Sequence, residues 1–140
     1  MTASTIFAGL VGNSAALNAL PWVPYSADGR RNVEIVRLYD TRNATPQGPA
    51  AALLKYQPGA RVARHLHPGF ELILVLDGVL NNDMGAHPAG TLEVCPPGSA
   101  HALWSDSGCI FLVVWEQPVV VQPAPPVQAM PVADTLALAE

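Results

Sequence analysis

Charged side chains are scarce in this chain of 140 residues: Lys, Arg, Asp and Glu make up 13% of it, and the formal net charge is −4. The charges are scattered and form neither a basic patch nor a long run of one sign, so nucleic acid is not expected as a partner. Half of the residues are hydrophobic, which argues against disorder. The length suits a single domain with a substantial buried core.

Cysteine is also scarce. The two cysteines, Cys95 and Cys109, form no CxxC pair, which excludes a zinc ribbon or a thioredoxin-like redox motif. We interpret both as small, half-buried thiols. A disulfide between them remains open, because the sequence alone does not say how far apart they lie.

The N-terminal segment lacks charge altogether, since no Lys, Arg, Asp or Glu occurs among the first 27 residues. A secretory signal would require positive charge ahead of its apolar run, and glycines and asparagines interrupt the stretch before it could span a membrane. We therefore predict an apolar arm over 1–19, weakly structured or with a short helix, that packs on a partner subunit. A homodimer, no membrane contact and, by default, a cytoplasmic location are the corresponding expectations.

Helical periodicity is largely missing, and short apolar runs between Gly and Pro turns take its place. This pattern predicts an all-β fold, a barrel or a double-sheet sandwich, over 20–121. A proline-rich tail is predicted over 122–140, with one or two helical turns at 133–140. The expected strands cover 33–39, 51–56, 62–67, 71–76, 91–95, 101–105 and 110–116, with an extension at 119–121.

Turn residues predict where these strands end. Pro58–Gly59 is expected to close one strand, and Asp77–Gly78 is expected to form a hairpin. Asn81–Pro88 is expected to be a polar loop that carries His87 on the surface. Because 71–76 is continuously apolar after its first residue, both faces of that strand are expected to be buried.

Three of the four histidines and one glutamate fall into an ordered pattern. Residues two apart on a strand share a face, so His65 and His67 point to one side. Glu71 follows the break at Pro68–Gly69, which re-aims it, and His101 comes from another strand. If the two strands are neighbours in a barrel, the four side chains converge in a set that suits a divalent transition metal with open coordination positions. We predict one metal ion per chain, iron or zinc before manganese or nickel, held by His65, His67, Glu71 and His101.

The same residues resemble the two cupin motifs. Residues 59–78 match the first motif, G-x5-H-x-H-x3-E-x6-G, at every position. Residues 90–105 match the second, G-x5-P-x-G-x2-H-x3-N, except that Ser105 replaces the asparagine. Over residues 20–118 the chain is similar to the ChrR-like cupin domain. The resemblance implies a single jelly-roll β-barrel whose metal is held by those three histidines and the glutamate.

ChrR-like cupin domains occur in zinc anti-sigma factors and in stand-alone cupins, including dioxygenases that act on diketones. The resemblance therefore implies, as the leading interpretation, an iron-dependent dioxygenase-like enzyme for a small diketone or hydroxyketone. One alternative is a non-catalytic module, with zinc, that senses a ligand or an oxidant. Another is a metal-dependent isomerase or hydrolase. The expected partner is a small molecule, and no organic cofactor is expected.

No catalytic side chain is evident, because Glu71 is committed to the metal. Tyr56, Arg61 and Trp104 are candidates for the pocket wall, although residues of these types more often have structural roles. Strand parity turns Trp104 outward. The residues that parity places on the ligand-bearing face are Arg61, Ala63, Leu103 and Ser105.

Overall fold

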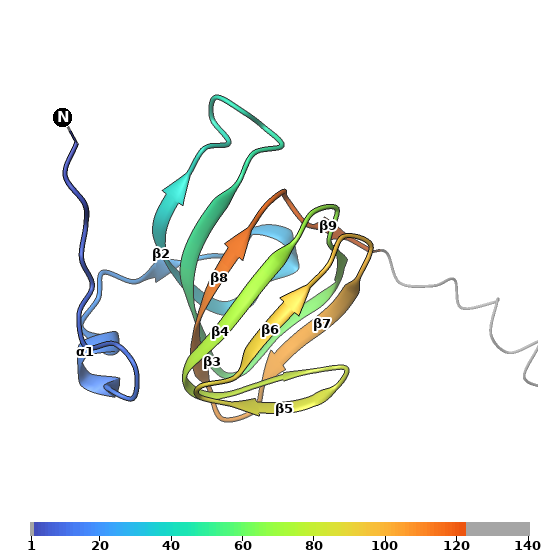
Figure 1. Ribbon diagram of the computed structural model, residues 1–140. Coiled ribbons are helices and arrows are strands. Elements are labelled where there is room, and N and C mark those ends of the chain that lie inside the picture. The colour runs from blue at the N-terminus through green and yellow to red at the C-terminus, as the bar shows by residue number, and fades with distance from the viewer. Residues whose placement is uncertain (1, 123–140) are drawn as a thin grey trace, which may run out of the picture.

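The computed structural model describes residues 2–122, and most of them are in strands (Figure 1). The predicted helical turns at 133–140, like nearly all of the predicted tail, lie outside the described residues. A short helix precedes the first strand, and a short 3-10 helix lies between the first and second strands. The elements are α1 (Ser14–Asn18), β1 (Val23–Pro24), η1 (Ala27–Gly29), β2 (Arg31–Asp40), β3 (Ala50–Leu66), β4 (Glu71–Asn82), β5 (Gly85–Pro88), β6 (Leu92–Cys95), β7 (Ala100–Ser105), β8 (Cys109–Trp115) and β9 (Val120–Val121).

Strands β3 and β4 close the sheet into a barrel. The first half of β3 pairs with β8 and its second half with β7. The first part of β4 also pairs with β8, and Asn81, near its end, pairs with Trp104 of β7. Two long strands that each bond both β7 and β8 form a closed ring of hydrogen-bonded neighbours. The predicted single all-β barrel is therefore confirmed.

Strand β3 is continuous where two strands were predicted. It runs through Pro58–Gly59, and Gly59 has a φ of +87°. On the β2 side the register shifts there, because Arg31 pairs with Arg61 whereas Val33 pairs with Tyr56. The Pro-Gly pair thus marks a bulge and not the end of a strand. At this bulge the pairing partner of β3 changes from β8 to β7.

Strand β4 also continues through its predicted turn, so the expected hairpin at Asp77–Gly78 is wrong. The register with β8 shifts between Val75 and Asp77, and Gly78 has a φ of +74°. A Cβ atom on Gly78 would overlap the carbonyl oxygen of Gly108. Glycine is needed here for the close approach of the chain that leads into β8, and not for a reversal.

The reversal comes six residues later, between β4 and β5, with the turn at Asp83–Met84. Residues 81–88, predicted to be a loop, therefore lie mostly in strands. His87 is half-buried on β5, and its Nε2 lies 2.8 Å from Oδ1 of Asn82. The fourth histidine thus has a structural partner of its own, away from the other three.

Two apolar clusters flank the barrel wall. The inner cluster fills the barrel and includes Tyr56 and Phe111, whose rings meet edge to face with centroids 5.1 Å apart. The outer cluster forms where α1 lies against the wall, and Leu17 of α1 is completely buried in it. Trp22 fixes this helix by donating a hydrogen bond from Nε1 to the carbonyl of Leu17 (2.8 Å). None of the described helices is long and apolar enough to cross a membrane.

Candidate metal centre

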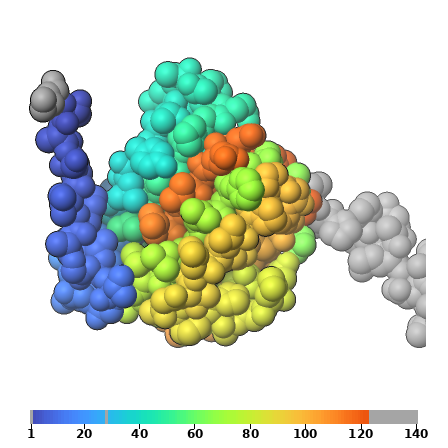
Figure 2. Space-filling model, viewed as in Figure 1, coloured from blue at the N-terminus to red at the C-terminus, as the bar shows by residue number. Residues whose placement is uncertain are grey.

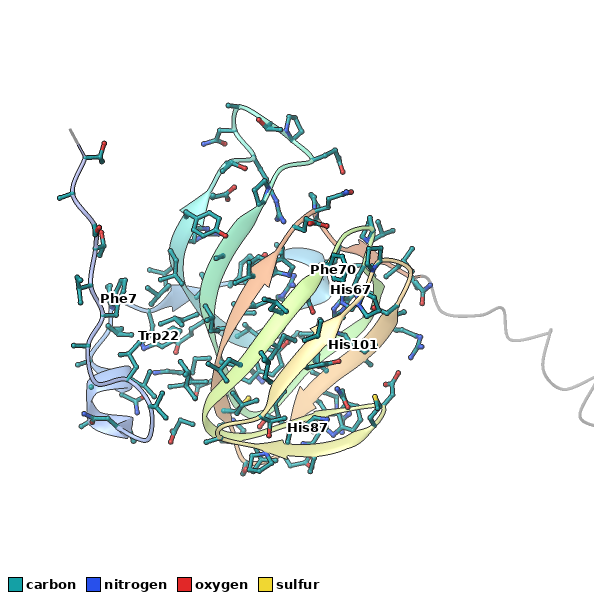
Figure 3. The ribbon with its side chains drawn as sticks, in the orientation of Figure 1. Phe7, Trp22, His67, Phe70, His87 and His101 are labelled. Carbon is teal, nitrogen blue, oxygen red and sulfur yellow. The ribbon has the colours of Figure 1, made fainter. Side chains whose placement is uncertain are left out.

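The structure brings the four predicted residues together inside the barrel. His65 on β3 and His101 on β7 are cross-strand partners, His67 follows β3 directly, and Glu71 begins β4. All four are buried, with exposed fractions between 1% and 4%. In Figure 3, His67 and His101 lie on the same flank of the barrel.

Two tight connections hold these elements in place. The β3–β4 connection and the turn before β7 bond to each other, because His67 donates its N–H to the carbonyl of Ser99 (2.9 Å) and Gly98 donates to the carbonyl of His67 (2.8 Å). A turn at Pro97–Gly98 precedes β7, and Gly98 has a φ of +91° in it. These bonds set β7 beside the end of β3, so His101 faces the two histidines of the first motif.

The inward direction of His65 depends on an irregularity that parity does not reveal. The β3–β7 register shifts between Val62 and His65, and both of these side chains are buried although they are three residues apart. Arg61 and Ala63 are exposed, so the prediction that they share the histidine face is wrong. On β7 parity holds, because Leu103 and Ser105 are buried with His101.

The three imidazole rings present their edges to a common centre. The ring centroids are 5.2 Å apart for His65 and His67, 4.7 Å for His65 and His101, and 4.5 Å for His67 and His101, with interplanar angles of 84° to 88°. Oε2 of Glu71 lies 3.1 Å from Nε2 of His67 and 3.3 Å from Nε2 of His101. One ligand atom from each of the four residues lies within 4.8 Å of the others, a spacing that could accommodate one metal ion.

The outer nitrogen of each imidazole has a fixed partner. Nδ1 of His65 lies 3.0 Å from the carbonyl of Ala63, and Nδ1 of His67 lies 3.0 Å from Oγ of Ser99. Nδ1 of His101 lies 3.1 Å from a carboxylate oxygen of Glu93 on β6. Such contacts fix the ring orientation and tautomer, and they leave each Nε2 free to bind a metal.

The inner nitrogens support a cation more directly. Nε2 of His67 and Nε2 of His101 are buried, and the group that each of them faces is Oε2 of Glu71, at 3.1 Å and 3.3 Å. A divalent ion at the centre would use these lone pairs and balance the buried carboxylate, so the residues present fit a metal.

The electrostatics of the centre also favour positive charge. Burial acts to raise the pKa of Glu71, but the contacts with His101 and His67 outweigh it and hold this pKa at about 2. Burial lowers the pKa of His65 to about 4. Burial acts to lower the pKa of His101 as well, but the contacts with Cys95, Glu71 and Glu93 raise it to about 11. An ionised Glu71 beside a cation on His101 is the charge pattern expected of a site that holds a proton or a metal.

Sequence reasoning missed Glu93, which contacts His101. Glu93 and Cys95 alternate with exposed residues on β6, so both point inward. Sγ of Cys95 lies 3.9 Å from Nδ1 of His101 and 4.0 Å from Oε2 of Glu71. The sequence did contain a hint of this contact, because Glu93 lies two residues before Cys95 on a predicted strand and therefore faces the same side. A single carboxylate on a short strand is common, however, so the hint did not single Glu93 out.

Both cysteines are free, and both are buried, more deeply than predicted. Burial raises the pKa of each thiol, for Cys109 to about 12. Neither thiol has the depressed pKa that marks a reactive cysteine.

The residues predicted for the pocket wall lie elsewhere. Tyr56 belongs to the inner cluster, and Arg61 lies over the outward-facing ring of Trp104, 5.8 Å from its centroid. A partly enclosed hollow of about 160 Å³ does adjoin His101, and its lining includes Glu93 and Cys95. This hollow meets the centre from the side of Glu93.

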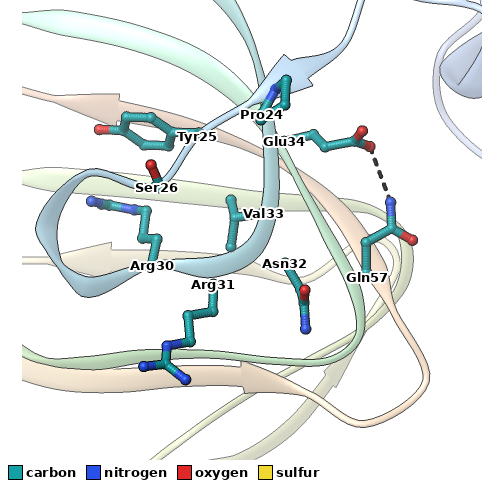
Figure 4. A pocket seen from close by; sticks show the side chains of 9 residues that line it. All are labelled: Pro24, Tyr25, Ser26, Arg30, Arg31, Asn32, Val33, Glu34 and Gln57. Carbon is teal, nitrogen blue, oxygen red and sulfur yellow. Dashed lines mark hydrogen bonds between the residues drawn. The ribbon is translucent and has the colours of Figure 1, made fainter.

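A larger hollow, of about 610 Å³, opens where β1 leads into β2 (Figure 4). Its lining includes Tyr25 and Arg30, and the Arg30 guanidinium lies over the Tyr25 ring, 4.7 Å from the centroid. Its one carboxylate, Glu34, accepts a hydrogen bond from Gln57 (3.0 Å). It contains no histidine and no cysteine, so we place the chemistry at the histidine centre and not in this more open hollow.

A closed all-β barrel with three inward-facing histidines and one glutamate defines a cupin. A family model described as the ChrR Cupin-like domain matches residues 13–119, most of the chain. The chain therefore belongs to the ChrR Cupin-like domain family. No curated protein matches the sequence.

Solved structures share the barrel at low sequence identity. The acetylacetone dioxygenase from Acinetobacter johnsonii aligns over 88% of this chain and 84% of its own, with 14% identity and a TM-score of 0.65. The polyketide cyclase RemF from Streptomyces resistomycificus covers 97% and 99%, with 18% identity and a TM-score of 0.65. The anti-sigma factor ChrR of Rhodobacter sphaeroides, solved with SigE, covers 71% and 50%, with 25% identity and a TM-score of 0.56. These likenesses establish the cupin barrel.

Proposed function

We propose that this protein binds one divalent metal ion through His65, His67, Glu71 and His101. The observation that carries the proposal is the convergence of one buried ligand atom from each of these four residues, all within 4.8 Å of one another. The three outer contacts to Nδ1 add support, because they hold the rings as ligands before any ion arrives. Iron and zinc both suit three imidazoles and a carboxylate, with manganese and nickel as further choices.

We propose further that the protein is a dioxygenase-like enzyme for a small diketone or hydroxyketone. Four protein ligands leave two positions open on a six-coordinate metal. A metal there would polarise the oxygens of a chelating diketone and stabilise the negative charge that develops on them. Dioxygen is the second substrate in this reaction class. The fold shared with an acetylacetone dioxygenase supports the substrate class by analogy.

The residues around the centre have definable roles in this proposal. The carboxylate of Glu71 supplies negative charge to the ion, and Glu93 orients His101 through Nδ1. Ile73 and Val113, buried in the inner cluster, help to keep water from the interior of the barrel. None of the described side chains at the centre is left over as a dedicated base, because the nearest carboxylates, Glu71 and Glu93, are both engaged with histidines.

A sensing module is the second candidate. The likeness to ChrR favours it. In that case zinc would occupy the centre, and a ligand or oxidant would be bound without turnover.

Metal content and dioxygen uptake distinguish the two. Freshly purified protein is expected to hold close to one iron per chain and to consume dioxygen when acetylacetone is added. His101→Ala is expected to lose both, whereas His87→Ala, which changes the fourth histidine and lies outside the centre, is expected to keep both. Zinc with no dioxygen uptake after iron reconstitution would favour the sensor. No bound metal in the reconstituted wild-type protein would refute the metal centre itself.

We also propose that the protein is a homodimer. The support is the exposed apolar surface of the N-terminal arm, in which Ile6 is 81% and Val11 is 70% exposed. Soluble monomers rarely leave such a segment in water.

A further inference from the structure

The N-terminal arm carries large apolar side chains that are open to solvent. Ile6 is 81% and Val11 is 70% exposed, whereas Phe7, at 40%, is more than half covered. Among the described residues, those from 2 to 9 make no hydrogen bond, and the arm is first held at Gly12, which donates to the carbonyl of Leu76 at 3.5 Å. Figure 2 shows this arm standing apart from the body of the molecule, and Figure 3 places Phe7 on it.

A second apolar surface lies on the outer side of β4 and β6. Leu72 is 40% exposed, although the sequence predicted it to be buried, and Leu92 and Val94 are 59% and 55% exposed. Leu72 pairs with Val94 across the two strands, and Leu92 lies two residues before Val94, so the three side chains share one face. We call this patch of Leu72, Leu92 and Val94 the bare face. Its reverse side carries Glu71 and Cys95, so it backs the wall of the metal centre.

The bare face continues a surface that the base of the arm already covers. Leu74 lies on the same side of β4 as Leu72, and it pairs with Leu92 and with Leu112 of β8. Leu74 and Leu112 pack against the outer cluster, as do Leu10 and Trp22 from the N-terminal region. One end of this apolar surface is thus covered by the chain itself, and the arm leaves the barrel before it reaches the other end.

We propose that the arm of one copy of this chain lies across the bare face of a second copy, and the reverse, in a two-fold symmetric homodimer. Neither surface carries charge: the arm has none, and the three residues of the bare face are aliphatic. Each copy supplies one arm and one face, so the pair closes without leaving either surface free. Ten extended residues reach at most about 35 Å, and three strands span only about 10 Å at their usual spacing, so the arm is long enough.

This inference specifies the interface of the homodimer proposed above and does not depend on the metal. Sedimentation equilibrium of the full chain tests it with two charge-introducing variants, one on each surface. Ile6→Asp/Val11→Asp and Leu92→Asp/Val94→Asp are each expected to raise the dimer dissociation constant about a hundred-fold or more, because each buries two aspartates in place of two aliphatic side chains. Tyr39→Asp is the matched control, since Tyr39 is 47% exposed and lies on β2, a strand that pairs with β1 and β3. It is expected to leave the constant unchanged.

Thermal unfolding checks that each variant is folded, and metal content is measured beside it. A wild-type protein that is monomeric at all concentrations would refute both the homodimer and this interface. A dimer that both double variants leave intact would refute the interface alone. Neither result tests the metal centre, which is tested separately by the metal content.

Disulfide trapping identifies which copy receives the arm. A mixture of Ile6→Cys and Leu92→Cys chains is expected to form a mixed covalent dimer on mild oxidation, while the native thiols, which are buried, remain unreacted. The double variant Ile6→Cys/Leu92→Cys is expected to give a covalent dimer too. If it instead closes within one chain and stays a monomer, the arm folds back on its own barrel and the proposal is overturned.

Discussion

Metal binding is expected to release about one proton per chain at about pH 8, and that proton comes from His101. The three imidazoles must be neutral and the carboxylate ionised before they can bind an ion. With pKa values of about 4 for His65 and about 2 for Glu71, these two groups have already lost their protons at that pH. His101 has not, because Cys95, Glu71 and Glu93 outweigh its burial and raise its pKa to about 11.

The size of the pH effect on metal affinity follows from competition between the proton and the ion for one nitrogen of His101. Between about pH 7 and about pH 10, the observed affinity is expected to rise about tenfold per pH unit. Calorimetric titration with zinc in two buffers of different ionisation enthalpy measures the proton count directly. A histidine with an ordinary pKa of about 6.5 would release almost no proton at about pH 8. A count near zero would therefore refute the charge assignment of His101, even if the metal binds.

Two variants locate the proton. Glu93→Gln removes a negative charge while keeping an oxygen for Nδ1 of His101, so the pKa of His101 is expected to fall and less than one proton to be released. His87→Ala changes a histidine outside the centre and is expected to leave the number of protons released unchanged.

The stability of the metal-free protein is expected to depend on pH through the same proton on His101. The raised pKa of His101 contributes stability that is complete below about pH 6.5 and is lost as the pH rises through about 11.

Three further predictions concern stability. The lowered pKa of His65, about 4, means that the metal-free protein loses stability as the pH falls from about 6.5 through 4, and denaturant unfolding of His65→Gln is expected to show a flatter pH dependence in that window. Gly78→Ala is expected to cost about 3 kcal/mol, because its Cβ meets the Gly108 carbonyl at a positive φ, whereas Gly59→Ala, also at a positive φ but with open space around it, is expected to cost about 1 kcal/mol. Equal costs would contradict the contact. Leu17→Ala is expected to lower the free energy of unfolding by about 2–5 kcal/mol, and a smaller loss in denaturant unfolding would show that α1 contributes little to the fold.

The sequence was sufficient to predict the barrel and the meeting of His65, His67, Glu71 and His101 inside it, because both depend on local patterns. His65 and His67 alternate on one strand, and His101 follows a turn that proline and glycine specify. Short apolar runs between such turns leave few folds other than a barrel or a sandwich. The four residues accordingly meet in space as the spacing predicted.

Pairing between strands was harder to predict. Pro58–Gly59 and Asp77–Gly78 have the composition of turns, but each lies in a long strand at the point where its partner changes, and a single sequence carries no sign of that change. The bulge before His65 reversed the expected direction of Arg61 for the same reason. Leu72 was expected to be buried because an apolar run does not say whether a second layer covers it.

If His65, His67, Glu71 and His101 bind an ion as proposed, their order along the chain has a consequence for how the protein matures. His65, His67 and Glu71 lie within seven consecutive residues, whereas His101 arrives on a strand synthesised about thirty residues later. A half-site of three ligands needs only a short local loop, and short loops close much faster than β7 can find its place between β3 and β4. An ion captured at that stage would serve as a template on which β7 docks, so the metal present during synthesis, and not the affinity of the finished barrel alone, would decide which ion the protein keeps.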